Sequence, residues 1–307
     1  MNNYLTVISG SDIDTIYDVE SFPKAGDACL AREIDTKAGG CILNVGTIAS
    51  YFGAPVKVLD YLKENDPGTD LLLSSIKASG MDCSHIRFGK DVVNGRCLIM
   101  RNGDEKCIFV IPPEHPIYEK EDPEISAVLE NSGYIYSIAH TLIDAFGEDL
   151  SMLYRAKEKG AKLALDGSSQ YNDPREAEIT EHADLLFINT QSYQRLSERY
   201  GKPAAEHLLE KGAAIICVTD GAKGSVCYTK DGSRKMDAVK LDKVIDSTGA
   251  GDTFAAAFLT SLMKGEDIAA AHERATYAGA RACLFTGAID PGFNEEELQR
   301  FIQEHSR

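Results

Sequence analysis

Short apolar segments alternate with amphipathic segments along most of the chain. The apolar segments predict strands at residues 4–9, 56–62, 133–138, 162–166, 184–189 and 213–219. Apolar residues at helical spacing predict helices at 44–52, 70–79, 149–159, 191–199, 203–211, 251–264, 268–284 and 294–304. Strands that alternate with helices are typical of a doubly wound, mostly parallel α/β sheet with helices on both faces.

Two segments depart from this alternation. Residues 15–37 and 91–111 contain strand patterns with no helix between them, and Asn102-Gly103 is typical of a hairpin turn. We therefore expect one α/β domain over residues 1–307, with a lid subdomain formed by a small β-sheet from these two segments. The alternative is that they add strands to one edge of the main sheet.

Charge and composition narrow the classes of ligand and location. The 307-residue chain has a net charge of −16, which argues against binding to nucleic acid or to acidic membranes. An anionic ligand must then be held locally by backbone amides, a few cations or a metal. No apolar stretch approaches the ~18–20 residues of a membrane span. Eight cysteines without a CxxC pair predict buried free thiols, as in a reducing compartment. No signal peptide is evident, so we expect a cytoplasmic protein.

The strongest chemical signal lies at residues 246–254, which read DSTGAGDTF and open a predicted helix. A glycine-rich turn at a helix N-terminus presents free N–H groups and the positive end of the helix dipole, which together bind anions. Asp252 lies beside that site, where a carboxylate is suited to take a proton during phosphoryl transfer to a hydroxyl. The alternative is a glycine-rich cap in which Asp252 only complements the dipole. Neither a GxxxxGK[ST] loop nor a GxGxxG motif after the first strand is present.

The segment DSTGAGDTFAAAF resembles the C-terminal signature of the PfkB family of ribokinase-like carbohydrate kinases. Four other segments are similar to motifs of that family and follow its order: SGSDID at 9–14, AGG at 38–40 followed by Asn44, TDGAKG at 219–224, and GA at 287–288. The resemblance implies a ribokinase-like fold with a β-lid and an ATP-dependent kinase. Its acceptor would be a hydroxymethyl group of a sugar, a sugar-like molecule or a nucleoside.

The resemblance also implies roles for individual residues. Asp252 would be the general base, and the amides of Gly249, Ala250 and Gly251 would form the anion hole. The acceptor would be held by Asp12, Asp14, Gly39, Gly40 and Asn44. The nucleotide would be lined by Asn189, Thr219, Gly221, Gly224 and Gly287. Magnesium would accompany ATP, and Asp246 would belong to a potassium site if the protein has one.

Simpler interpretations of some of these residues remain open. Asp12 and Asp14 are also suited to cap a turn after the first strand, and Asn44 is suited to be the N-cap of its helix.

The chain departs from the family pattern at three positions. Ser192 stands where many members have a glutamate that organises magnesium-bound water, Cys41 stands where ribokinase has a lysine, and Ser9 replaces a glycine. Cys41 argues against ribose as the acceptor. Ser192 prompts an alternative function, a catalytically weak relative that senses a sugar or nucleotide.

Apolar residues in the expected lid predict a homodimer. Leu98, Met100, Ile108 and Val110 give the small sheet more apolar surface than it can bury by itself. Packing of two lids against each other would cover the exposed side and form a two-fold dimer.

Overall fold

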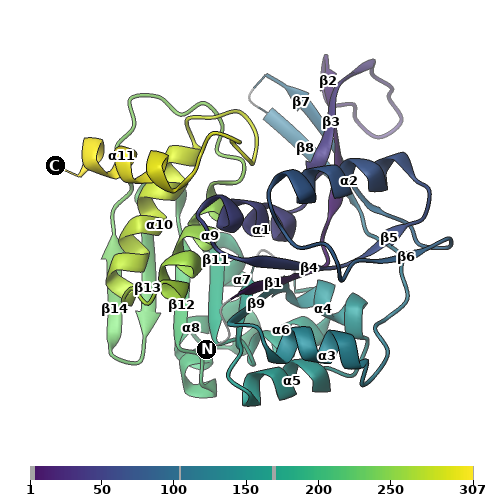
Figure 1. Ribbon diagram of the computed structural model, residues 1–307. Helices are drawn as coiled ribbons and strands as arrows, with labels where there is room; N and C mark the ends of the chain where they lie inside the picture. Colours follow the sequence, from purple (N-terminus) through teal and green to yellow (C-terminus); the bar gives the residue numbers. More distant parts are fainter. Residues whose placement is uncertain (1–3, 104, 168–170, 307) are drawn as a thin grey trace.

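A computed structural model describes residues 4–103, 105–167 and 171–306. Its main sheet has eight strands in the order β14-β13-β12-β11-β10-β9-β1-β4 (Figure 1). The bounds are β1 Leu5–Ile8, β4 Val56–Leu59, β9 Tyr134–Ile138, β10 Lys162–Asp166, β11 Leu185–Asn189, β12 Ile215–Thr219, β13 Ser225–Thr229 and β14 Gly232–Met236. Neighbouring strands from β4 to β12 are parallel, whereas β13 is antiparallel to both of its neighbours, β12 and β14.

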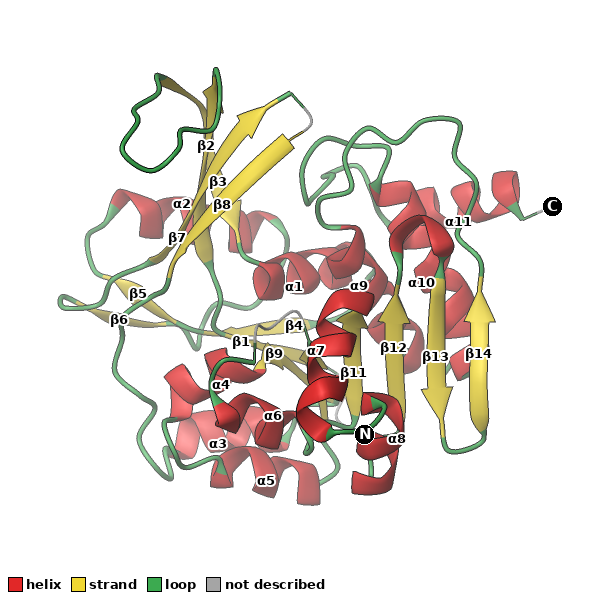
Figure 2. Cartoon of the chain, turned by 180° about the vertical axis from the view of Figure 1, so that it is seen from behind, coloured by secondary structure: helices red, strands yellow, loops and turns green. Residues whose placement is uncertain are grey.

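Helices cover both faces of this sheet, as Figure 2 shows. One core contains residues of α1 (Cys41–Tyr51), α2 (Pro67–Ala78), α9 (Ala250–Met263), α10 (Ile268–Ala282) and α11 (Glu295–His305). The other core contains residues of α3 (Pro123–Glu130), α4 (Ala139–Phe146), α5 (Ser151–Glu158), α6 (Pro174–Thr180), α7 (Thr190–Tyr200) and α8 (Ala204–Lys211). Val7 and Ile8 of β1 point into opposite cores, as expected for a strand buried on both faces. The predicted doubly wound fold is confirmed.

The sequence pattern missed several elements. The predicted strand 56–62 is divided by Asp60 into β4 and β5 (Tyr61–Lys63), and β5 pairs with β6 (Arg87–Gly89) in a separate two-stranded sheet. The antiparallel strands β13 and β14 were not predicted, because β14 is largely exposed and lacks an apolar run. Helices α3, α4 and α6 were also missed. They have only seven or eight residues, although α5 and α8, which also have eight, were predicted.

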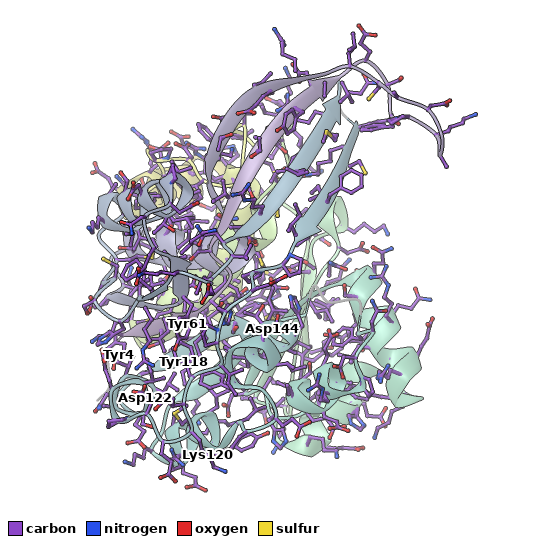
Figure 3. The ribbon with its side chains drawn as sticks, turned by 90° about the vertical axis from the view of Figure 1, so that its right-hand side faces the viewer. Tyr4, Tyr61, Tyr118, Lys120, Asp122 and Asp144 are labelled. Atoms are coloured by element: carbon purple, nitrogen blue, oxygen red, sulfur yellow. The ribbon has the colours of Figure 1, made fainter. Side chains whose placement is uncertain are left out.

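Residues from the two exceptional segments form a separate four-stranded sheet, in the order β3-β2-β7-β8. Its strands are β2 (Asp12–Val19), β3 (Ala31–Gly39), β7 (Gly95–Asn102) and β8 (Glu105–Ile111). Figure 3 shows this sheet standing away from the rest of the molecule, so the alternative of an extra edge on the main sheet is wrong. The sheet begins at Asp12, earlier than predicted. That it acts as a lid stays a prediction.

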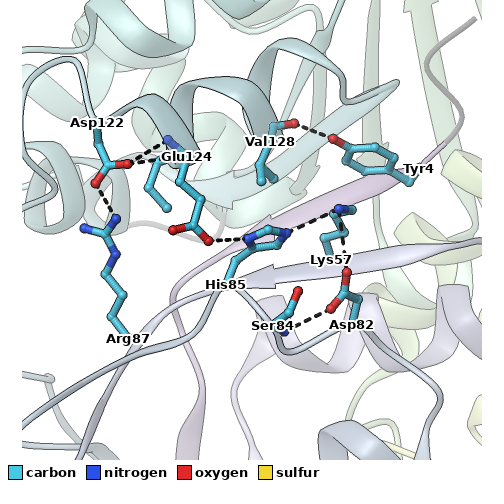
Figure 4. A network of polar contacts seen from close by, with 10 residues as sticks. Tyr4, Lys57, Asp82, Ser84, His85, Arg87, Asp122, Glu124 and Val128 are labelled. Atoms are coloured by element: carbon cyan, nitrogen blue, oxygen red, sulfur yellow. Dashed lines mark hydrogen bonds and ion pairs between the residues drawn. The ribbon is translucent and has the colours of Figure 1, made fainter.

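Polar contacts fix α3 against the two-stranded sheet and β4 (Figure 4). Asp122 caps α3 by accepting hydrogen bonds from the N–H groups of Glu124 and Ile125, and it forms an ion pair with Arg87 of β6. Farther along the helix, the Tyr4 hydroxyl donates to the Val128 carbonyl over 2.7 Å. Asp122, which lies in an acidic stretch of the sequence, is thus the N-cap of this helix.

The described residues contain no helix that is both long and apolar enough to cross a membrane. The eight cysteines are free, but only Cys217 and Cys227 are buried, and Cys107 is exposed. The expectation of buried thiols is therefore wrong for most of them. The cytoplasmic location stays a prediction.

Candidate active site

The candidate site lies at the edge of the main sheet where the parallel strands end. At the end of β1 the chain turns sharply, since Ser9 and Gly10 have φ angles of 58° and 77°. The Ser9 side chain is held there by a 3.2 Å hydrogen bond to Asp60. Ser9 therefore occupies a left-handed conformation that usually favours glycine. This is the position at which the family pattern has a glycine and this chain has a serine. The turn leads directly into β2 and places Asp12 and Asp14 above this edge.

Asp12 and Asp14 point from one face of the small sheet. Asp12 pairs in register with Gly39 of β3, and Asp14 pairs with Lys37. After β3 the chain enters α1 through Gly40, whose φ is 96°. A Cβ on Gly40 would lie 2.0 Å from the Gly10 carbonyl oxygen, so only glycine permits the two turns to pack together. Both aspartates belong to strand β2, so they are not simply caps of a turn.

Asn44 and Asp252 bring α1 and α9 together. The Asn44 Nδ2 group donates a 2.7 Å hydrogen bond to Asp252 Oδ2. Because α1 begins at Cys41 with Gly40 as its N-cap, the interpretation of Asn44 as a helix cap is wrong. Two buried oxygens, Asn44 Oδ1 and Ser11 Oγ, have no hydrogen-bond partner among the described residues. Buried polar atoms need partners, so these two are suited to contact a bound hydroxyl.

The carboxyl groups of Asp252 and Asp12 hold their protons more tightly than free carboxyl groups do. Burial raises the pKa of Asp252 to about 7; the hydrogen bond from Asn44 opposes this shift, and the charges of Asp166 and Asp14 add to it. Burial also raises the pKa of Asp12 to about 7, helped by Asp14 and Asp60. A carboxylate with a pKa near neutrality is suited to general base catalysis.

The N-terminus of α9 has free backbone donors beside Asp252. Gly249 is the N-cap, with a φ of 75°, and no side chain caps the helix. The Ala250 N–H already lies 3.3 Å from the Ser247 carbonyl, and the Thr253 N–H donates to Gly249. Within the described residues, the N–H groups of Gly251 and Asp252 have no such acceptor. Of the three amides predicted for the anion hole, that of Ala250 is therefore partly engaged.

Asp246 organises the loop before α9. Its carboxylate accepts hydrogen bonds from the Thr248 N–H (2.9 Å), the Thr248 hydroxyl (2.7 Å) and the Gly287 N–H (2.9 Å). Burial raises the pKa of Asp246, but these bonds outweigh burial and lower it overall. Asp246 thereby joins the loop to Gly287.

The residues predicted to line the nucleotide lie along the same edge but contact one another only in part. Asn189 and Thr219 end neighbouring strands and are paired in register. The Asn189 side chain caps α7 by accepting from the Ser192 N–H, and Ser192 is buried. Gly221 is exposed in a short 3₁₀ turn, and Gly224 follows it at the start of β13. No direct hydrogen bond joins these described residues to Asp252.

Sequence reasoning missed residues that the fold brings to the site. Asp166 ends β10, where it accepts a hydrogen bond from the Tyr136 hydroxyl and raises the pKa of Asp252. Its place at the carboxyl end of a buried strand is a signal that points to ligands in α/β sheets. Lys37 and Lys106 come from the small sheet, and nothing in their local sequence indicates which loop they contact. Among the described residues, no three His, Cys, Asp or Glu side chains are arranged to hold a metal.

Comparison with known proteins identifies the family. The profile of the pfkB family carbohydrate kinases matches residues 2–295. A ribokinase from Staphylococcus aureus is 24% identical over 276 residues, which cover 87% of this chain and 88% of that protein. A nucleoside kinase from Methanocaldococcus jannaschii is 40% identical over 116 residues, but the match spans only 38% of this chain and 36% of the relative.

Solved structures show the same fold over nearly the whole chain. A ribokinase from Thermotoga maritima superposes with a TM-score of 0.84 at 24% identity and covers 98% of this chain and 99% of its own. The Arabidopsis thaliana ribokinase complexed with ribose and ATP has a TM-score of 0.82 at 21% identity, with 99% of both chains covered. The chain belongs to the pfkB family of carbohydrate kinases, and the protein is an ATP-dependent carbohydrate kinase.

Proposed function

We propose that this kinase transfers the γ-phosphate of ATP to a hydroxymethyl group of a sugar, a sugar-like molecule or a nucleoside, with Asp252 as the general base. The observation that carries the proposal is the 2.7 Å contact between Asn44 and Asp252 at the start of α9. This contact orients a carboxylate, whose pKa burial raises to about 7, beside backbone donors that have no acceptor among the described residues. A base and an anion-binding helix terminus at one place are what phosphoryl transfer to a hydroxyl requires.

In the proposed reaction, Asp12, Asp14, Gly39, Gly40 and Asn44 orient the acceptor. The Asp252 carboxylate takes the proton of the acceptor hydroxyl while the hydroxyl oxygen forms a bond to the γ-phosphorus. The bond between that phosphorus and the bridging oxygen of ADP breaks, and ADP leaves. The N–H groups at the start of α9, with that of Gly251 the least engaged, donate to the transferred phosphoryl group.

Nucleotide and magnesium would enter at the neighbouring strand ends. Asn189, Thr219, Gly221, Gly224 and Gly287 would line the nucleotide. Since no three metal-binding side chains converge in the described part of the chain, magnesium would be held chiefly by the phosphates and water. When bound, it neutralises charge on the phosphates. The sensor function suggested by Ser192 is not favoured, because the family match covers residues 2–295 and the Asn44–Asp252 pair is intact.

A panel of acceptors tests the proposed function. Some relatives and structural neighbours are ribokinases, a ketohexokinase and nucleoside kinases, so the panel should include ribose, fructose and inosine. In single-turnover reactions with γ-labelled ATP, at least one acceptor should receive the label on a hydroxymethyl oxygen. We expect ribose to be a poor acceptor, because Cys41 stands where ribokinase has a lysine. Hydrolysis of ATP without transfer to any sugar or nucleoside would contradict the proposal.

We further propose that Asp246 helps to bind potassium. Its oxygens accept three hydrogen bonds, and a carboxylate has about four acceptor sites, so capacity for a cation remains. Potassium should therefore raise kcat several-fold over tetramethylammonium. Asp246→Asn should reduce this activation and lower kcat less than changes at Asp252 do. An Asp246→Asn variant that potassium activates as fully as the wild type would place the ion elsewhere.

The small sheet is also the proposed dimer contact. The register shows that the four apolar residues lie on opposite faces: Leu98 and Met100 share one with Phe109, while Ile108 and Val110 share the face of Asp14 and Lys37. Phe109 is 55% exposed on the face away from the site. Sedimentation should show a dimer at micromolar concentration, and Phe109→Asp should convert it to a monomer. A monomeric wild type would rule out this contact.

A further inference from the structure

The small sheet sends a lysine to the loop that begins α9. Lys106 of β8 donates a 2.8 Å hydrogen bond from Nζ to Thr248 Oγ1, although the two residues are 142 positions apart in the sequence. Thr248 in turn donates to Asp246, and Lys106 helps to lower the pKa of that carboxyl. The side chain thus spans the space between the small sheet and the loop that would hold the phosphates.

A second lysine from the same face lies against the neighbouring loop. A Cβ built on Gly287 would lie 2.8 Å from Lys37 Nζ, so this ammonium group sits directly beside the Gly287 backbone. Lys37 pairs in register with Asp14, and its charge opposes the effect of burial on the pKa of Asp14. Lys37 therefore lies between the residues expected to hold the acceptor and a residue expected to line the nucleotide.

Both lysines are poised at a site that lacks positive charge. The protein has a net charge of −16, the charge of Asp14 helps to raise the pKa of both Asp12 and Asp252, and that of Asp166 adds to the effect on Asp252. Among the described residues, neither Lys37 nor Lys106 lies within 4.0 Å of a carboxylate. A triphosphate brought to such a site needs cations to offset repulsion, and unpaired ammonium groups bind phosphate strongly.

We propose that Lys106 and Lys37 bind the β- and γ-phosphates of the nucleotide, so that the small sheet supplies positive charge to the phosphate site. This inference rests on the proposed function for its substrate, ATP. In the absence of nucleotide, Lys106 bonds to Thr248. With ATP bound, its ammonium group donates instead to a phosphate oxygen beside that hydroxyl. Lys37 donates from the acceptor side, where the γ-phosphoryl group passes to the hydroxyl.

Neutral variants of the two lysines test the proposal. Lys106→Met and Lys37→Met retain much of the side-chain length but remove the charge. We expect each to weaken the binding of ATP by about 10- to 100-fold, since a lost charge-assisted hydrogen bond has effects of that size. The affinity for AMP, which lacks the β- and γ-phosphates, should change less than about twofold in the same titrations. Lys106→Arg should restore most of the affinity for ATP.

Arg96→Met is the matched control. Arg96 is exposed on β7 of the same sheet, but its register partners Ile13 and Ile111 place it on the opposite face. The control loses the same charge and should bind ATP and AMP as the wild type does. If Lys106→Met binds ATP as tightly as Arg96→Met, the role given to Lys106 is wrong, and the same comparison decides the role of Lys37.

Different results would overturn the phosphate contacts of the two lysines and the proposed phosphoryl transfer. Loss of ATP binding in the two lysine variants would support the phosphate contacts even if the wild type phosphorylated no sugar or nucleoside. Phosphoryl transfer by the wild type, with unchanged ATP affinity in both variants, would keep the proposed function and overturn the phosphate contacts. Circular dichroism melts should match the wild type for Lys106→Met, because Lys106 is exposed.

Discussion

Replacing Asp252 with asparagine should lower kcat by about 10²–10⁴-fold, because general base catalysis usually contributes that much. Asparagine has nearly the same shape, and its Oδ1 can still accept the hydrogen bond from Asn44 that Asp252 accepts over 2.7 Å. The variant loses the ability to take a proton, together with the negative charge of the carboxylate. Binding of ATP should be unchanged or tighter, since one negative charge beside the phosphates is removed. Turnover and nucleotide affinity should be measured on the same preparation.

The pH dependence of the wild type provides a second readout of the base. Burial raises the pKa of Asp252 to about 7, so the fraction of active carboxylate grows as the pH rises toward that value. The ratio kcat/KM should therefore increase up to about pH 7 and then level off. Asp12 has a pKa of similar size, so the Asp12→Asn variant serves as the control. It should keep the inflection if Asp252 is the base and lose the inflection if Asp12 is responsible.

Thermal stability distinguishes a base from a helix cap. The folded-state pKa of Asp252 lies above the unfolded value of about 3.9, so the folded protein binds the extra proton between these two values. Its contribution to stability is present below pH 4 and is lost as the pH rises through about 7. At pH 8 the ionised carboxylate costs stability, and Asp252→Asn should melt no lower than the wild type. A melting point several degrees lower, together with near-normal turnover in the folded fraction, would make Asp252 a structural cap.

The sequence was sufficient for the parts of the fold and site that rest on local patterns. The parallel strands are buried on both faces and read as continuous apolar runs, and the glycine-rich turn marks the start of α9 in any context. Strand β14 was missed because it has too few apolar residues for a strand period to be visible. Helices α3, α4 and α6 were missed although α5 and α8, of similar length, were predicted, so length alone does not decide. Their positions depend on packing against the main sheet.

Contacts between distant segments escaped prediction for a different physical reason. Asn44 and Asp252 are 208 residues apart, and only the packing of α1 on α9 brings them together. Lys106 meets Thr248 because β8 lies at the edge of a sheet that stands over the loop. A lysine on an exposed strand has the same local pattern whether it faces solvent or a binding site. Family resemblance named both residues of the first pair but not the hydrogen bond between them, and it named neither Lys106 nor Lys37.

Replacing Gly249 with alanine should lower kcat by about 10²-fold or more, because a small displacement of positioned groups has effects of that size. Gly249 is the N-cap of α9 and has a φ of 75°, which disfavours a residue with a Cβ. The added Cβ would lie 2.5 Å from the Ala288 carbonyl oxygen, so the loop before α9 and the backbone at Ala288 must move apart. That movement displaces the Gly251 N–H and the Asp252 carboxylate together. Kinetics of the folded protein, with ATP and the best acceptor of the panel, give the measurement.

Gly265→Ala separates this collision from the general penalty of alanine at a positive φ. Gly265 lies just beyond the other end of α9 with a φ of 83°, and a Cβ there meets no heavy atom within 4 Å. Both substitutions should lower the melting temperature, since both force an L-residue into the left-handed region at about 1 kcal/mol. Only Gly249→Ala should lose turnover, because only there does the Cβ meet a backbone that cannot yield without moving the loop. If both variants keep wild-type kcat at a temperature where they are folded, the start of α9 tolerates displacement, and the donors at its first turn do not stabilise the transferred phosphoryl group.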